Sequence, residues 1–239
     1  PLRPVFWLET VATFAFAVSW LVKGDALFGD DRFHPSADGY AWARNVSGWR
    51  VEEYLRRTPA LFERMRELLG DDVELLHDVH SRLTPKTAVM LARALEPYRP
   101  FFLEDVLAPE FFSRLPEVRA ASPVPLAVGE LATSATDAAR LVRDHGVDFL
   151  RCHLSDIGGL SAGRRLAVLA EAEGVKTAWH SPGDASPFAV AAAVTLDVTS
   201  PAFGVQEGHV YNDASHEVFP GMIDIVGGWL APNDAPGWG

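Results

Sequence analysis

Three acidic residues recur at equal spacing in the middle of the chain. Asp78, Glu104 and Glu130 lie 26 residues apart, and each follows a short apolar run. Carboxylates that converge raise one another's pKa unless a cation lies between them. Oxygen-only ligation suits a hard ion such as Mg²⁺, which keeps positions open for water or substrate. The spacing predicts a Mg²⁺ site, and the alternative is three independent surface or salt-bridged acids.

Side-chain alternation along extended strands selects further candidates. If Asp78 faces the inside of the sheet, His80 faces it too, which makes its imidazole a candidate general acid or base beside the metal. Arg151 and His153 share a face by the same rule, and Cys152 between them takes the other. We therefore expect Cys152 to be packed and unreactive.

Two later apolar runs also end in polar residues. His180 begins the segment His-Ser-Pro-Gly-Asp, where it pairs with Asp184 or is a loop histidine bonded to backbone groups. Glu207 closes the run Phe-Gly-Val-Gln-Glu and either contacts a substrate or only accepts hydrogen bonds.

The elements that must position these residues alternate between short apolar runs and helical patterns. Apolar residues recur at helical spacing from Val51 to Leu69 and again from Pro85 to Leu95. Short strands that alternate with helices indicate βαβ units and a parallel sheet. The apolar runs end at Val79, Leu103, Val128, Leu154, Trp179 and Val205, and further helices are expected at 110–120, 134–145, 160–173 and 185–194.

Six strands that all end in polar groups favour one architecture. In a (β/α) barrel this face carries the active site, whereas an open doubly wound sheet binds ligands only at its switch point. We predict an α/β fold with a (β/α) TIM-type barrel. Residues 51–239 form the barrel domain with the metal site, and residues 1–50 form a divergent N-terminal segment and long loop.

Composition excludes several classes of protein. The 239 residues include 21 Lys and Arg against 32 Asp and Glu, a formal charge of −11. This net negative charge argues against binding to nucleic acids and against binding to anionic lipid surfaces. The apolar stretch 5–22 contains Glu9, and we interpret it as buried strands or a core helix rather than a membrane span or signal peptide. With one cysteine, Cys152, no intrachain disulfide or Cys-based zinc site can form, and we expect a cytoplasmic location.

The polar motifs in combination resemble the enolase superfamily, and most closely its mannonate dehydratase branch. The resemblance covers residues 51–239 and rests on 77–85, 101–105, 125–130, Arg151, 180–184, 203–207 and 218–220. It implies a modified barrel in which Asp78, Glu104 and Glu130, on barrel strands three, four and five, bind Mg²⁺. It also implies that His80 is the general acid and that Arg151, His180, Asp184 and Glu207 line a sugar-acid site.

The implied activity is that of a lyase. A Mg²⁺-dependent dehydratase would convert an acid sugar such as D-mannonate into a 2-keto-3-deoxy acid through a metal-stabilised enediolate. His80 would protonate the departing 3-hydroxyl. The alternatives are a dehydratase of another sugar acid such as D-gluconate, and an inactive barrel that binds metal and ligand only.

The chain departs from this branch in its first fifty residues. Neither the N-terminal capping domain nor barrel strands one and two is recognisable, and the branch's Tyr base and its Arg partner belong there. Tyr40, Arg44, Arg50 and Tyr54 are unaligned candidates, and His180 with Asp184 is a second hypothesis for the base. A six-stranded barrel exposes two edges, so we expect a homo-oligomer.

Overall fold

The computed structural model describes residues 50–144, 146–183, 185–232 and 236–237. The segment 5–22, the rest of residues 1–49 and Asp184 therefore lie outside the described residues. The elements, in chain order, are α3 (Val51–Leu69), β1 (Leu76–Asp78), α4 (Pro85–Leu95), η2 (Glu96–Tyr98), β2 (Phe102–Glu104), η3 (Pro109–Arg114), α5 (Leu115–Ala121), β3 (Leu126–Val128), α6 (Ala135–Arg143), β4 (Phe149–Leu150), α7 (Leu154–Ile157), α8 (Gly159–Ala172), β5 (Lys176–Thr177), α9 (Pro187–Asp197) and α10 (Asp213–Val218).

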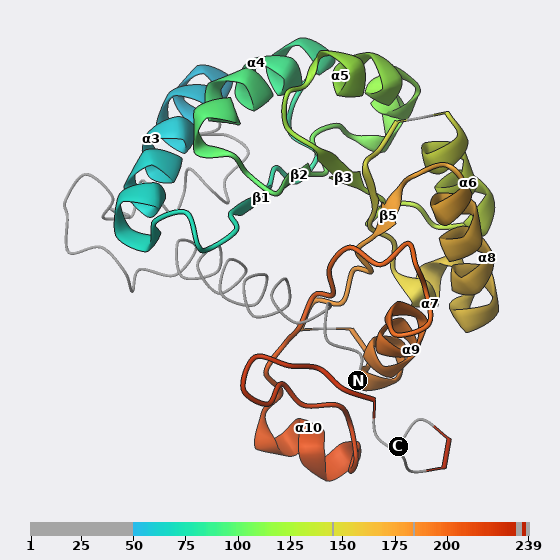
Figure 1. Ribbon diagram of the computed structural model, residues 1–239. Coiled ribbons are helices and arrows are strands. Elements are labelled where there is room, and N and C mark those ends of the chain that lie inside the picture. The colour runs from blue at the N-terminus through green and yellow to red at the C-terminus, as the bar shows by residue number, and fades with distance from the viewer. Residues whose placement is uncertain (1–49, 145, 184, 233–235, 238–239) are drawn as a thin grey trace.

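The described strands form one parallel sheet in the order β1-β2-β3-β4-β5. The strands lie on the inside of an arc, and α3, α4, α5, α6 and α8 cover its outside (Figure 1). This is the α/β barrel arrangement that the sequence predicts. Of the sixth predicted strand, the structure contains a single parallel bridge between Thr177 and Phe203.

The helices begin where local chemistry satisfies their free N–H groups. Thr84 caps α4 in a reciprocal pair with Thr87, and Pro85 occupies the first turn, where its missing N–H costs nothing. Ser134 caps α6 by accepting from the backbone N–H of Asp137. The bounds of α3 and α4 are those predicted from helical periodicity.

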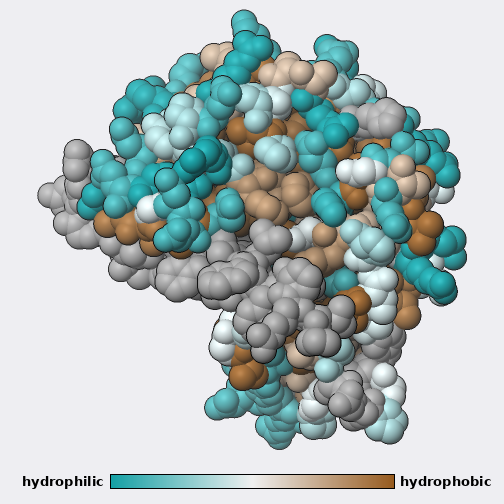
Figure 2. Space-filling model, in the orientation of Figure 1, coloured by the Kyte–Doolittle hydropathy of each residue, from teal (hydrophilic) through white to brown (hydrophobic). Residues whose placement is uncertain are grey.

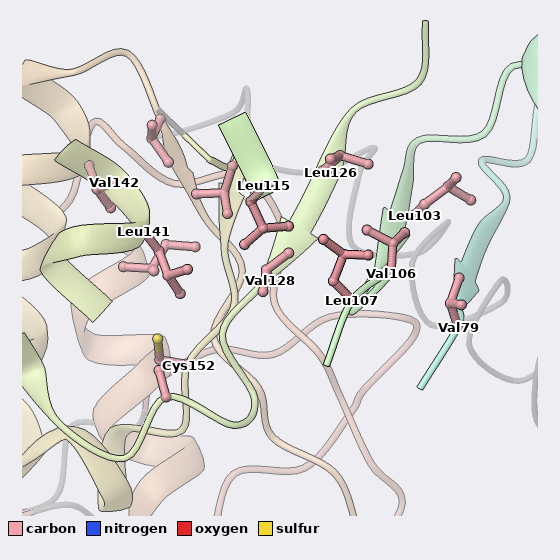
Figure 3. Packing of buried hydrophobic residues seen from close by; sticks show 14 of the residues in the cluster. Val79, Leu103, Val106, Leu107, Leu115, Leu126, Val128, Leu141, Val142 and Cys152 are labelled. Carbon is pink, nitrogen blue, oxygen red and sulfur yellow. The ribbon is translucent and has the colours of Figure 1, made fainter. Parts of the chain in front are cut away.

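The main core lies between the sheet and the helices. Leu103, Leu126, Val128 and Leu150 point outward from the strands into it, and they are fully buried. Figure 3 shows Cys152 packed with Leu141 and Val142 at one end of this core, and burial raises the pKa of its thiol. The expectation of a packed cysteine is confirmed.

A second, smaller apolar cluster lines the inner face of the sheet. Its buried members are Phe102, Ala127, Ala178 and Val205, and Leu76, Phe101 and Phe149 pack against them. Apolar residues gather inside the arc between hydrophilic ones (Figure 2). Because side chains alternate along a strand, positions two residues beyond this cluster face the same way, at the carboxyl end of the sheet.

Among the described residues, no helix combines the length and apolarity needed to cross a membrane.

Truncation of a core leucine tests this packing. Leu91 on α4 has no exposed surface, and we expect Leu91→Ala to lower the free energy of unfolding by about 2–5 kcal/mol, because a cavity replaces its contacts. Leu68→Ala on α3, where the leucine is 48% exposed, is the matched control and should cost less than about 1 kcal/mol. Chemical denaturation measures both, and equal losses would contradict this core.

Candidate active site

The parallel register brings the predicted carboxylates to one end of the sheet. Asp78 and Glu104 are direct partners across β1 and β2. Glu104 and Glu130 offer carboxylate oxygens within 4.8 Å of each other, and the third member of that described cluster is Asp105. The structure therefore places Glu104 beside both other predicted ligands and adds a carboxylate that the spacing does not single out.

Asp105 enters the cluster because the backbone turns after β2. Strict alternation would direct it away from Glu104, but its φ of 41° is left-handed. Its Oδ1 accepts a hydrogen bond from the backbone N–H of Gly129 at 3.3 Å, and its buried Oδ2 has no hydrogen-bond partner within the described part of the chain. Burial and the nearby carboxylates of Glu130 and Asp78 raise the pKa of Asp105 to about 8.

Glu104 experiences the same crowding. Burial raises its pKa well above the usual value, the Arg151 guanidinium opposes this, and the charge of Asp78 adds to it. Crowded, desolvated carboxylates with an unpartnered buried oxygen are the donor set that a hard divalent cation stabilises. The described residues fit Mg²⁺ on this ground.

His80 reaches Asp78 by a turn rather than by strand alternation. The strand ends at Asp78, and His80 has a left-handed φ of 55°. Its backbone N–H donates to Asp78 Oδ1 at 2.9 Å, and its Nε2 lies 2.9 Å from Oδ2. The prediction placed His80 beside Asp78 for the wrong reason. The side chain is 46% exposed, so it is accessible to a substrate.

Gly129 permits the close approach of β3 to β4. A Cβ there would lie 2.8 Å from Cys152 Sγ and 2.9 Å from the carbonyl carbon of Arg151, and the φ of 148° also disfavours other residues. Glycine at position 129 therefore lets the segment between β3 and Glu130 pack directly against the backbone that follows β4.

Arg151 is a buried cation between two buried acids. Its Nε donates to Glu104 Oε1, its Nη2 lies 3.0 Å from Glu207 Oε2, and its Nη1 donates to the Ala178 carbonyl at 3.4 Å. Burial lowers the pKa of the guanidinium, but Glu104 and Glu207 more than compensate and raise it. The planar guanidinium thus ties β4 to both acids.

Glu207 lies at the last predicted strand end and is buried there. Its Oε2 also accepts from the backbone N–H of Ser181 at 2.6 Å, while its Oε1 has no hydrogen-bond partner among the described residues. Gln206 braces this corner, because its Nε2 donates to Ser181 Oγ at 3.1 Å and to the Glu207 carbonyl at 2.8 Å.

His180 is paired with another histidine. Its Nδ1 lies 2.8 Å from His153 Nε2, and its Nε2 lies 3.7 Å from Glu104 Oε1. Burial lowers the pKa of His180 far below its usual range, and the charges of Arg151 and His153 act in the same direction, so the ring is neutral. Asp184, the partner that the sequence suggested, lies outside the described residues.

One candidate base lies outside this cluster. Tyr54 on α3 is buried, and its hydroxyl lies 2.6 Å from His77 Nε2, on the side of β1 that faces the helices. Arg50 pairs with Glu53 at 3.0 Å at the start of the same helix. Tyr40 and Arg44 lie outside the described residues.

Sequence reasoning overlooked Asp105, Ser181 and Gln206. Asp105 directly follows a predicted ligand, but alternation assigns it to the opposite face. Ser181 and Gln206 act through a backbone N–H and an amide, which no spacing rule selects.

Comparison with known proteins identifies the family. The model of the enolase C-terminal domain-like family matches residues 36–239, and the chain belongs to this family. The resemblance to the enolase superfamily is therefore confirmed.

Within this family, the chain is similar to several proteins whose names specify an activity or a ligand. The chain is 61% identical over 201 residues to a D-galactonate dehydratase family member of Catenulispora acidiphila, covering 84% of this chain and 47% of the relative. It is 40% identical over 211 residues to a D-mannonate dehydratase of Caulobacter sp. strain K31, covering 88% and 52%. The crystal structure of an enolase from Pantoea ananatis with bound D-gluconate and Mg is 46% identical with a TM-score of 0.76, covering 80% of this chain and 46% of that one. The chain spans about half the length of the curated relatives it matches.

Removal of the buried guanidinium tests the charge cluster. We expect Arg151→Met to lower the free energy of unfolding by about 3–5 kcal/mol, because Glu104 and Glu207 would then lack their cation. Arg114→Met breaks a solvent-exposed pair with Glu117 and should leave the free energy of unfolding nearly unchanged. The free energy of unfolding of both variants is measured by urea denaturation without divalent ions. An unchanged free energy of unfolding in Arg151→Met would contradict the buried pairing.

Proposed function

We propose that this chain forms the metal- and substrate-binding domain of an acid-sugar dehydratase, a hydro-lyase that acts on a D-mannonate-like sugar acid. The observation that carries the proposal is the convergence of Glu104, Asp105 and Glu130 within 4.8 Å at the carboxyl ends of parallel strands. Buried Arg151 and partly buried His180 lie at the same end, which supports a catalytic rather than a structural role for the cluster.

Asp78, Glu104 and Glu130 would hold Mg²⁺. When bound, the ion would act as a Lewis acid that stabilises negative charge on the substrate carboxylate. The proposal leaves Asp105 as a buried neighbour whose free Oδ2 contributes a further oxygen or binds an ordered water.

Two histidines would move the protons. His180 would accept the proton from the carbon next to the substrate carboxylate, and the contact between its Nδ1 and His153 Nε2 would orient the ring. His80, accessible and beside Asp78, would donate a proton to the departing 3-hydroxyl. These two transfers release water and leave a 2,3-enol, which becomes the 2-keto-3-deoxy acid when C3 is protonated and the enol hydroxyl loses its proton.

Arg151, Asp184 and Glu207 would line the sugar-acid site. The free Oε1 of Glu207 supports this role, because a buried acceptor without a partner can receive a substrate hydroxyl. Arg151 holds the carboxylates of Glu104 and Glu207 in place.

The proposed substrate is D-mannonate, with D-gluconate as the second candidate. The first choice is supported by the likeness to a D-mannonate dehydratase, and the second by the solved relative with bound D-gluconate. An inactive barrel that binds metal and ligand is the other alternative.

We also propose a homo-oligomer in the cytoplasm, with residues 51–239 as its barrel domain. The described sheet has the strand order β1-β2-β3-β4-β5, and pairing between copies of a chain is one way to cover the edges of a sheet.

A turnover assay tests the activity. With Mg²⁺ and a panel of sugar acids, we expect a 2-keto-3-deoxy product that disappears with EDTA and falls by at least about 10³-fold in Glu104→Gln, since loss of a ligand removes charge stabilisation. Glu110→Gln, which changes an exposed acid on η3, is the matched control. Calorimetric Mg²⁺ binding without turnover on any acid would support the inactive barrel instead.

A histidine variant tests the proposed base. His180→Ala should lower kcat by about 10²–10⁴-fold, because no group would remain at that position to accept the proton. The measurement is steady-state turnover on the best substrate, with His216→Ala on α10 as control. Full turnover by His180→Ala would exclude it as the base.

A further inference from the structure

The histidine pair is part of a second cluster of metal-ligating side chains. Glu130, His153 and His180 each offer one ligand atom, and these atoms lie within 4.8 Å of one another. The three residues follow β3, β4 and β5, so three neighbouring strands position them. The rings of His153 and His180 meet edge to face, with centroids 4.3 Å apart.

The donor atoms of this cluster differ from those of the carboxylate cluster. Glu104, Asp105 and Glu130 offer oxygens alone, which suit Mg²⁺. Two imidazoles and a carboxylate instead suit borderline ions such as Zn²⁺ and Co²⁺. Three protein ligands with an open fourth position are also the ligand count of zinc sites that bind a small molecule or water.

We propose that Glu130, His153 and His180 form a second cation site that takes a divalent transition metal such as Zn²⁺ and competes with Mg²⁺ for Glu130. Because Glu130 serves both sites, two divalent cations would lie close together and share its negative charge, so binding of one weakens binding of the other.

The geometry needs one small adjustment. His153 Nε2 and His180 Nδ1 are 2.8 Å apart, the separation of a hydrogen bond. Two Zn–N bonds of about 2.0–2.1 Å at a tetrahedral angle hold the nitrogens about 3.3 Å apart. Metal binding therefore opens the pair by about 0.5 Å and releases the proton that the two rings share.

Occupation of this site has a consequence for activity. It would remove Glu130 from the Mg²⁺ set and His180 from proton transfer, so Zn²⁺ would inhibit the enzyme. This consequence rests on the proposed function, whereas binding of the metal does not.

Co²⁺ binding to the full chain tests the site without any turnover. Four-coordinate Co²⁺ with nitrogen ligands absorbs strongly in the visible range, whereas a six-coordinate, oxygen-ligated ion absorbs weakly. We expect the strong band in the unmodified chain and in the control His216→Asn, and at least about tenfold weaker binding in His153→Asn. Equal spectra and affinities in all three would overturn the proposal.

Histidine resonances provide a test that needs no variant. With ¹⁵N-labelled histidine, Zn²⁺ should shift the ring nitrogens of two residues, His153 and His180, and leave His77 unchanged. Shifts confined to other histidines would refute the site.

Competition with Mg²⁺ tests the shared carboxylate. Rising Mg²⁺ should weaken the apparent Co²⁺ affinity in proportion to Mg²⁺ occupancy, while His153→Asn keeps its Mg²⁺ affinity within about twofold. Independent binding of the two ions would disprove the sharing of Glu130.

Discussion

The parallel pairing of five strands is the constraint on which the site depends. Because the strands are parallel and in sequential order, all their carboxyl ends lie at the same end of the sheet, and the residues that follow different strands meet there. Asp78 faces Glu104 in register, and Arg151 follows β4 directly. The apolar cluster one step earlier on the inner face supports these polar positions from below. The chemistry is therefore a consequence of register rather than of any single loop.

Charge burial is the cost of this arrangement. Glu104 and Glu207 are buried and share one guanidinium, Arg151. Asp105 is also buried, and the nearest charges that raise its pKa are those of other carboxylates. Buried charges destabilise a fold unless they are paired or bind an ion. A bound cation would thus stabilise the protein most beside the carboxylates that Arg151 does not neutralise.

The carboxyl end of the sheet combines two kinds of metal-ligating atom, oxygen and nitrogen. Carboxylates from β2 and β3 form an oxygen-only group, and the histidines after β4 and β5 form a nitrogen pair that meets it at Glu130. In the proposed dehydratase, Glu104 and Glu130 of the first group bind the ion together with Asp78 of β1, and His180 of the second group accepts a proton. A carboxylate that borders both groups makes the site sensitive to which ion is present.

Local signals in the sequence determined the longer helices and the alternation of strands and helices, but not α7 or α10. They also placed Asp78, Glu104, Glu130, Arg151, His180 and Glu207 at the ends of apolar runs. Periodicity and caps act over a few residues, so α3 and α4 could be predicted to the residue. Tertiary structure decided the rest. The left-handed backbone at Asp105 brings into the cluster a side chain that alternation would direct away, and a turn at His80 keeps that residue beside Asp78 after the strand has ended. The contact between His153 and His180 joins residues 27 positions apart. Such contacts depend on the relative positions of two loops in the folded protein. The periodicity of a strand or helix does not encode these positions.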